Sequence, residues 1–258
     1  MFKKIEKILL KYIPIFYLGL TRAQDSNDRF IFGSDFIKKN KKNTSCSILD
    51  VGCGGGNFFA YINSQIKNST YLGIDFDYDK MKENKFHNFK NFSTISKDLR
   101  TDWYYDKYDF VWSSEVIEHL FDDQNFFKKL VNSTKRDGYT IITTPYYNSY
   151  LNFAKKYNWS LEPSKEEVTG HVRLGYNEED LKKLALINNL ELEGIYYISE
   201  CDNFRAKNFF KVNNGLFCYF FNILYFLKIL NYKRYIKGEN TVDKMKYFSI
   251  AAVYKNIN

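Results

Sequence analysis

Apolar residues recur at two different spacings along the chain, and the spacing predicts the type of each element. Short apolar runs bounded by polar residues predict strands, whereas apolar positions three or four residues apart predict helices. The two kinds of segment alternate between residues 45 and 145. The predicted strands are 47–51, 70–75, 91–96, 108–113 and 139–144. The predicted helices are 57–67, one from about 79, and 115–131, which Asp122 and Asp123 could interrupt. This alternation predicts a doubly wound, Rossmann-like, mostly parallel α/β sheet that binds ligands at the carboxyl ends of its strands.

The flanking segments carry other patterns. Residues 2–20 predict an amphipathic helix that Pro14 kinks or ends, and residues 28–42 predict a second helix with a basic tail. Asn177, followed by three acidic residues, predicts the capped start of a late helix. Two late strands are expected to add an antiparallel hairpin at the sheet edge, which gives seven strands in all. They are 190–199 and 246–254.

A cluster of glycines separates the first predicted strand from the helix that follows it. Asp50 precedes Gly52 by two residues, and three more glycines follow at positions 54 to 56. Glycines at such a turn let a ligand lie against bare backbone amides, and a buried acid beside them is costly unless something pairs with it. A dinucleotide site would need another glycine where Asn57 stands, and the Gly-Lys-Ser/Thr of a phosphate loop is absent. The turn therefore favours a ligand without phosphates.

Acidic residues also end or follow the next two strands. Asp75 lies 25 residues after Asp50. Its two oxygens could accept both hydroxyls of a ribose, although an acid there could also cap the following helix. Phe76 could stack on a base or contact its edge. Asp98 and Leu99 follow the third strand.

Three runs together resemble the class I S-adenosylmethionine (SAM) dependent methyltransferases. They are D-x-G-x-G-x-G from Asp50, E-x-I-E-H from Glu115 and G-x-x-x-I-x-T-P from Gly138. The resemblance covers roughly residues 45–200 and is nearest to the ubiquinone-type and small-molecule O-methyltransferases. It implies that SAM is the cofactor, with Asp98 accepting from the adenine amino group. The cofactor residues that it implies are Asp50, Gly52, Cys53, Gly54, Asp75, Phe76, Asp98, Leu99 and Ser114.

Glu115, Glu118 and His119 are spaced so that one helix face could carry all three side chains. With the distant His171 they could bind a divalent metal, and this set resembles the metal site of small-RNA 3′-terminal 2′-O-methyltransferases. Without a metal, His119 or His171 could act as the general base on an acceptor hydroxyl. The structural alternative makes Glu115 a helix cap, leaves Glu118 in solvent and packs His119 beside the cofactor.

We expect one methyltransferase domain over residues 1–258. Its predicted parts are an N-terminal helical cap (1–44), a SAM-binding core (45–145) and two substrate-side inserts (146–176 and 203–236). The second insert contains 12 consecutive uncharged residues from Leu216 to Leu227, flanked by lysines. That run is too short to cross a bilayer but could lie at a membrane surface, roof the site or pack on the core.

Composition changes this picture little. The net charge of +8 hints at an anionic partner, but the charge is spread along the chain as on a solvated surface. Four scattered cysteines predict reduced thiols. Lys11 interrupts the apolar N-terminal stretch, so no secretory signal is predicted. We expect a cytoplasmic protein, with peripheral contact at the inner face of a membrane as an option.

The predicted activity is methyl transfer from SAM to an oxygen of a small-molecule, glycan or lipid-linked acceptor. One alternative is an RNA 2′-O-methyltransferase, although beyond net charge and the Glu-Glu-His set nothing indicates a nucleic-acid partner. Another is a SAM-binding partner subunit without catalysis.

Overall fold

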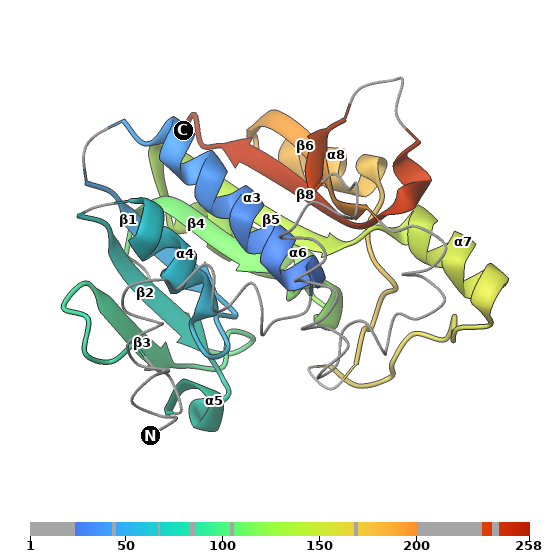
Figure 1. The fold of residues 1–258 in the computed structure, drawn as a ribbon, viewed down its shortest axis with the longest axis horizontal. Coiled ribbons are helices and arrows are strands. Elements are labelled where there is room, and N and C mark those ends of the chain that lie inside the picture. Colours follow the sequence, from blue (N-terminus) through green and yellow to red (C-terminus); the bar gives the residue numbers. More distant parts are fainter. Residues whose placement is uncertain are drawn as a thin grey trace, which may run out of the picture.

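The computed structural model describes residues 24–42, 45–66, 68–82, 86–103, 106–167, 170–200, 234–238 and 243–258. Its centre is an eight-stranded sheet in the order β3-β2-β1-β4-β5-β8-β6-β7, shown in Figure 1. The strands are β1 (Ser47–Val51), β2 (Thr70–Asp75), β3 (Phe92–Ser96), β4 (Tyr108–Ser114), β5 (Thr134–Pro145), β6 (Glu191–Glu200), β7 (Tyr235–Lys237) and β8 (Tyr247–Lys255).

The sheet is parallel from β3 to β5 and antiparallel beyond. Strand β8 pairs with both β5 and β6 in the antiparallel sense. These pairings confirm the Rossmann-like α/β fold and the late antiparallel pair. The described sheet has one strand more than the seven expected, because the three residues of β7 add to the free edge of β6.

Helices cover both faces of the sheet. Rings from α3 and α4 pack on one face around Trp112, whereas α6 and α8 pack on the other face around Val111. Because neighbouring residues of a strand point to opposite faces, Val111 and Trp112 enter different cores. The helices are α3 (Gln24–Asn40), α4 (Asn57–Gln65), α5 (Tyr78–Lys82), α6 (Asp123–Asn132), α7 (Tyr147–Tyr157) and α8 (Glu178–Ile187), with 3₁₀ turns η1 (Ile117–His119) and η2 (Lys244–Lys246).

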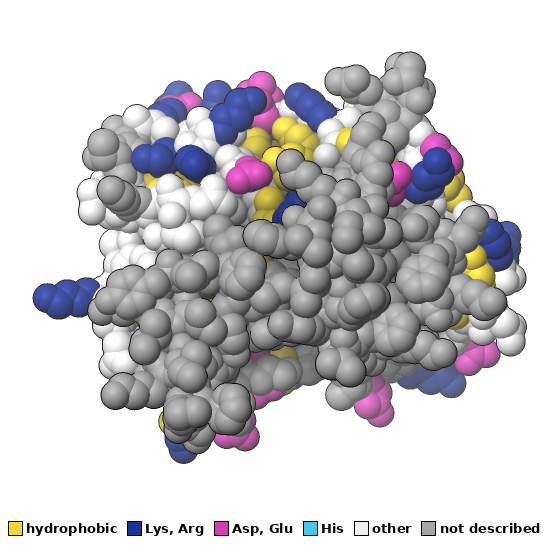
Figure 2. Space-filling view, in the orientation of Figure 1, with side chains coloured by type: hydrophobic (Ala, Val, Ile, Leu, Met, Phe, Trp, Pro, Cys, Tyr) yellow, Lys and Arg dark blue, Asp and Glu magenta, His cyan; other side chains and the backbone are white. Residues whose placement is uncertain are grey.

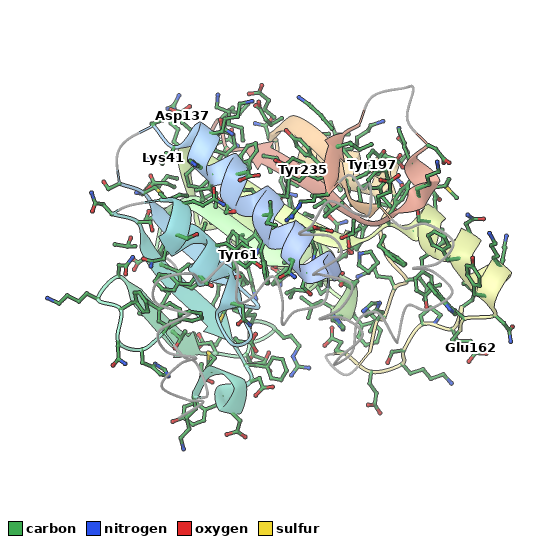
Figure 3. All side chains as sticks on the ribbon, viewed as in Figure 1. Lys41, Tyr61, Asp137, Glu162, Tyr197 and Tyr235 are labelled. Carbon is green, nitrogen blue, oxygen red and sulfur yellow. The ribbon has the colours of Figure 1, made fainter. Side chains whose placement is uncertain are left out.

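Helix α3 is fixed to the sheet by buried polar contacts near its start. The Tyr61 hydroxyl of α4 donates to Asn27 Oδ1 at 2.7 Å. Tyr61 is labelled among the side chains in Figure 3. The Ser199 hydroxyl donates to Asp28 Oδ2 at 2.9 Å. The helix begins at Gln24, four residues before its predicted start.

The predicted helix 115–131 was wrong in its first part, whereas the interruption expected at Asp122 and Asp123 is confirmed. Glu115 has a positive φ of 56°, and its amide donates to the Thr143 carbonyl at 2.9 Å, so the chain continues its contact with β5. Only η1 follows, and α6 begins at Asp123, where the Asp122 side chain caps it by accepting from Asn125 N at 3.2 Å. Glu115, Glu118 and His119 therefore do not share a helix face.

Other boundaries differ less. The insert predicted at 146–176 contains α7, which projects from the sheet in Figure 1. The predicted cap of α8 is confirmed as a capping box between Asn177 and Asp180. The predicted helix 2–20 and nearly all of the insert 203–236 lie outside the described residues. In the part of the chain that the structure describes, every helix is too short or too polar to cross a bilayer.

Candidate functional site

The glycine turn after β1 is bonded to the end of β2. The amides of Gly52 and Cys53 donate to the Ile74 carbonyl at 2.8 and 3.1 Å. The next amide, that of Gly54, donates to Asp75 Oδ2 at 2.7 Å. Two acidic strand ends and the bare backbone of the turn are thereby held together at the carboxyl edge, as the sequence predicted.

Two glycines of this turn have different surroundings. A Cβ on Gly52 would lie 2.2 Å from Val116 Cγ2, because the turn packs closely on the chain after β4. A Cβ on Gly54 would meet no described atom within 4 Å. Both residues have positive φ, 79° and 52°, a region that favours glycine. The space beside Gly54 is where a ligand can approach the backbone.

We expect Gly52→Ala to destabilise the fold by at least about 2 kcal/mol, because it adds a clash with Val116 to the backbone strain. Gly54→Ala is the matched control and should cost only about 1 kcal/mol, from backbone strain alone. Urea unfolding of both variants measures the difference. Equal losses would show that close packing on Val116 does not constrain the turn.

Asp50 is buried behind the turn, where the Tyr71 hydroxyl donates to its carboxylate. Burial is the main cause that raises the pKa of Asp50 to about 7, and the nearby charge of Asp75 adds to it. The hydrogen bond from Tyr71 partly opposes the shift. Asp50 therefore changes charge near neutral pH, and a nearby cation would favour its ionised form.

Asp75 is a buried acceptor with both oxygens already in use. Besides the Gly54 amide on Oδ2, the Asp77 amide donates to Oδ1 at 2.9 Å. A carboxylate has about four acceptor positions, so two remain for ligand hydroxyls. Phe76, which follows it, exposes 49% of its surface and is free to contact a flat ring.

Asp98 and Leu99 lie on the neighbouring loop, which Lys97 N joins to the Asp75 carbonyl at 2.9 Å. Leu99 is buried, whereas Asp98 lies at the surface and pairs with Arg100. The Arg100 guanidinium is the main cause that lowers the pKa of Asp98, so this carboxylate is ionised. The predicted acceptor is thus correctly charged but already has a partner.

Ser114 leads a polar chain at the end of β4. Its hydroxyl lies 2.8 Å from Thr143 Oγ1, which in turn donates to Glu115 Oε1 at 3.2 Å. The same Glu115 oxygen lies 3.7 Å from Nε of Arg29, a buried residue of α3. Sequence reasoning missed Arg29. The signal available was an arginine among the polar residues that begin an otherwise apolar helix face.

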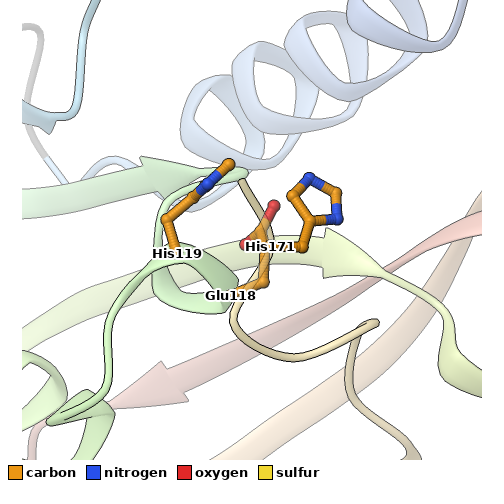
Figure 4. A group of neighbouring side chains, drawn as sticks. All are labelled: Glu118, His119 and His171. Carbon is orange, nitrogen blue, oxygen red and sulfur yellow. The ribbon is translucent and has the colours of Figure 1, made fainter. Parts of the chain in front are cut away.

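Glu118, His119 and His171 converge beside this chain, as Figure 4 shows. One ligand atom from each lies within 4.8 Å of the others. His119 Nδ1 lies 2.9 Å from the Gly170 carbonyl, and the amides of Val172 and Arg173 donate to the Glu118 carbonyl. These contacts attach the segment that carries His171 to η1. Three of the four predicted metal-site residues therefore meet, whereas Glu115 faces Arg29.

Glu118 is fully buried, and the expectation that it could face solvent was wrong. Among the residues that the structure describes, neither of its oxygens accepts a hydrogen bond of standard geometry, although the Thr144 hydroxyl lies close by. Burial is the main cause that raises the pKa of Glu118 well above its ordinary range, and the charge of Glu115 adds to it. Burial also lowers the pKa of His171 to about 4, so its ring is neutral near pH 7.

This donor set fits a divalent cation. Neutral imidazoles and a carboxylate are typical metal ligands, and a cation would pair the buried Glu118 carboxylate. The second shell is in place for His119, because the Gly170 carbonyl can accept from its other ring nitrogen.

Comparison with known proteins places the chain among methyltransferases. The sequence profile of a family described as "Methyltransferase domain" matches residues 24–194. The malonyl-[acyl-carrier protein] O-methyltransferase 2 of Ilyobacter polytropus is 26% identical over 54% of the chain and 52% of its own length. The ubiquinone biosynthesis O-methyltransferase of Hydrogenovibrio crunogenus is 29% identical over 45% of the chain and 51% of its own length. The chain thus spans about half the length of these curated relatives.

Solved structures agree on the fold. The plantazolicin methyltransferase BpumL, in complex with SAH, aligns with a TM-score of 0.54 and 18% identity, over 93% of this chain and 85% of its own. The small RNA methyltransferase HEN1 aligns with a TM-score of 0.58 and 14% identity, over 90% of this chain but 25% of its own.

Proposed function

The chain belongs to the methyltransferase-domain family of the class I SAM-dependent methyltransferases, and we propose that it transfers a methyl group from SAM to an acceptor oxygen. The observation that carries the proposal is the 2.7 Å bond between Gly54 N and Asp75. It fixes the bare glycine turn next to a carboxylate that has two acceptor positions left. This arrangement suits the amino acid part of SAM on the turn and the ribose at Asp75.

Further residues would hold the rest of the cofactor. Phe76 and Leu99 would border the adenine, with Asp98 accepting from its amino group. Cys53 contributes backbone to the turn, and Ser114 faces the cofactor from the end of β4. We also assign Arg29 to the carboxylate of the methionine part, because its cation lies buried at the carboxyl edge beside Glu115.

The proposed reaction is an in-line displacement, in which the acceptor oxygen attacks the methyl carbon and the sulfur leaves with its electron pair. The protein mainly positions the two centres and lowers the cost of removing the acceptor's proton. We propose that Glu118, His119 and His171 hold a divalent metal. The negative charge of the nearby Glu115 would favour the cation without binding it directly. When bound, the metal would lower the pKa of the acceptor hydroxyl. Without it, we propose His119 as the general base, because burial lowers the pKa of His171 to about 4 and makes that imidazole a weak base.

An oxygen acceptor is favoured by the O-methyltransferase relatives, both of which resemble only part of the chain. We propose a small-molecule, glycan or lipid-linked acceptor over RNA. In Figure 2, Lys and Arg alternate with Asp and Glu around the rim and form no continuous basic surface on the described part of that face. RNA remains the alternative that the metal-site residues would suit, and a non-catalytic SAM-binding subunit is the other.

Incubation with methyl-labelled SAM and cell-extract fractions tests the activity. We expect label in a lipid, glycan or small-metabolite fraction. Alkali would release the label as methanol from a methyl ester, and mass spectrometry of the product would assign an alkali-stable label to a methyl ether. Label in the RNA fraction would replace this acceptor with the alternative. Tight SAM binding with no label in any fraction would favour the non-catalytic subunit.

The affinity for SAM should rise with pH up to about 7. Asp50, whose pKa is about 7 in the free protein, is protonated below that value, and the ammonium of SAM favours its ionised form. Each pH unit below 7 should therefore weaken binding about tenfold, until the lower pKa of the complex is reached. Calorimetric titrations from pH 5.5 to 8.5 measure this slope. The same slope in Asp50→Asn would assign it to another group.

A further inference from the structure

Arg100 bridges two parts of the site that are distant in sequence. Its Nε donates to Asp98 Oδ1 at 2.9 Å, and its Nη2 donates to Asp98 Oδ2 at 2.6 Å. On its other side, Nη1 lies 3.5 Å from Oε2 of Glu167. The guanidinium thus makes a two-point pair with the loop after β3 and a second pair with the segment between α7 and α8.

The described parts of that segment, residues 158–167 and 170–175 and together called here the crossing segment, carry His171 past the end of β4. Glu167 is anchored on it by a second contact, because its Oε1 accepts from Phe121 N at 2.5 Å. The two described parts of the segment are bonded to each other, because Ser164 N donates to the His171 carbonyl at 2.7 Å. Gly170, Val172 and Arg173, on either side of His171, bond to η1. A displacement of Glu167 would therefore reach His171 through Ser164.

A cavity lies beside the ion pairs that Arg100 makes with Asp98 and Glu167. A cavity of about 240 Å³ opens between the loop after β3, the start of α6 and the crossing segment. Its lining residues are Leu99, Arg100, Leu120, Phe121, Asp122, Asn125, Phe126, Lys129 and Glu167. Beside this space, Arg100 supplies the charged contacts between Asp98 and Glu167.

We propose that Arg100 is a positioning residue that couples occupancy of the cofactor site to the position of the crossing segment. The inference rests on the proposed use of Asp98 at the adenine. A ligand that orders Asp98 orders Arg100, and through it Glu167 and the segment that carries His171. Coupling between two sites is reciprocal. Loosening Glu167 must therefore weaken the binding of the cofactor, although Glu167 does not touch it.

Calorimetry with SAM on the full chain tests the coupling. We expect Arg100→Ala to weaken binding about tenfold and Glu167→Gln about threefold, as suits partly exposed ion pairs. The double variant should bind SAM no more weakly than Arg100→Ala alone, because the two changes remove the same connection. Arg100→Lys should recover only part of the affinity, since an ammonium cannot make the two-point pair. Asp102→Asn breaks an exposed ion pair on the same loop and is the matched control, with unchanged affinity.

Hydrogen exchange gives a second readout that a purely structural role would not change. In the wild type, S-adenosylhomocysteine should slow exchange in peptides from the crossing segment as well as in those from the loop after β3. In Arg100→Ala the loop should still be protected and the crossing segment should not. If the wild type binds ligand but Glu167→Gln binds equally well and the crossing segment shows no protection, the coupling is wrong. If the wild type binds neither SAM nor its product, the proposed function fails instead.

Discussion

Asp75→Ala is expected to weaken SAM binding by about 100-fold, or about 2.7 kcal/mol. The change removes both acceptors for the ribose, and it also leaves the amides of Gly54 and Asp77 without their partner. Calorimetric titration with SAM measures the loss. Asp79→Ala provides a matched control, because Asp79 is an exposed acid four residues away on α5.

Asp75→Asn separates the two contributions. The amide oxygen can still accept from Gly54 N, so the turn should keep its shape, while the charge and one acceptor for the ribose are lost. We expect an intermediate loss of about tenfold. If Asp75→Ala binds SAM as well as Asp79→Ala does, the ribose lies elsewhere and its assignment to Asp75 is wrong.

Glu118→Gln is expected to stabilise the metal-free protein at pH 8 by about 2 kcal/mol, and to abolish its response to metal. The sign follows from the pKa of Glu118, which is raised above its unfolded value of about 4.3. The folded state therefore binds the proton more tightly than the unfolded state, and stability falls as the pH rises above that value. An uncharged glutamine removes this loss. Urea unfolding with chelator, from pH 5 to pH 8, measures it.

Metal addition distinguishes a binding site from a merely buried acid. Mn²⁺ at 100 times its dissociation constant should stabilise the wild type by about 2.7 kcal/mol and leave Glu118→Gln unchanged. Glu166→Gln is the control, because Glu166 is an exposed acid five residues before His171. Equal stabilisation of wild type and Glu118→Gln by Mn²⁺, Mg²⁺ and Zn²⁺ would remove the metal from the proposal.

The cofactor side of the site could be read from local sequence. Asp50 and Gly52 lie on either side of the last residue of β1, Asp75 ends β2, and the carboxyl ends of parallel strands meet at one edge. The strand order and the short turns then leave little freedom in where these residues lie. The structure accordingly brings the glycine turn and Asp75 into direct contact, although which of these residues touch SAM stays a prediction.

The acceptor side could be predicted only in part. Helical spacing placed Glu115, Glu118 and His119 on one face, but the bond from Glu115 N to Thr143 O breaks the helix there. Glu118 and His119 still meet His171, through contacts with residues 170–173. No local sequence pattern predicts these contacts. Arg29 reaches Glu115 from a helix more than 80 residues earlier in the chain, so its place depends on tertiary packing. Such long-range contacts are invisible to periodicity.

The most direct test of the central claim is calorimetric titration of the wild type with SAM and with S-adenosylhomocysteine at pH 7.5. We expect one site per chain, with a dissociation constant on the order of micromolar for both ligands. We also expect Asp75→Ala to weaken the binding of both ligands about 100-fold and Asp79→Ala to leave it unchanged. Absence of binding by the folded wild type to either ligand would contradict the cofactor site on which every other proposal depends.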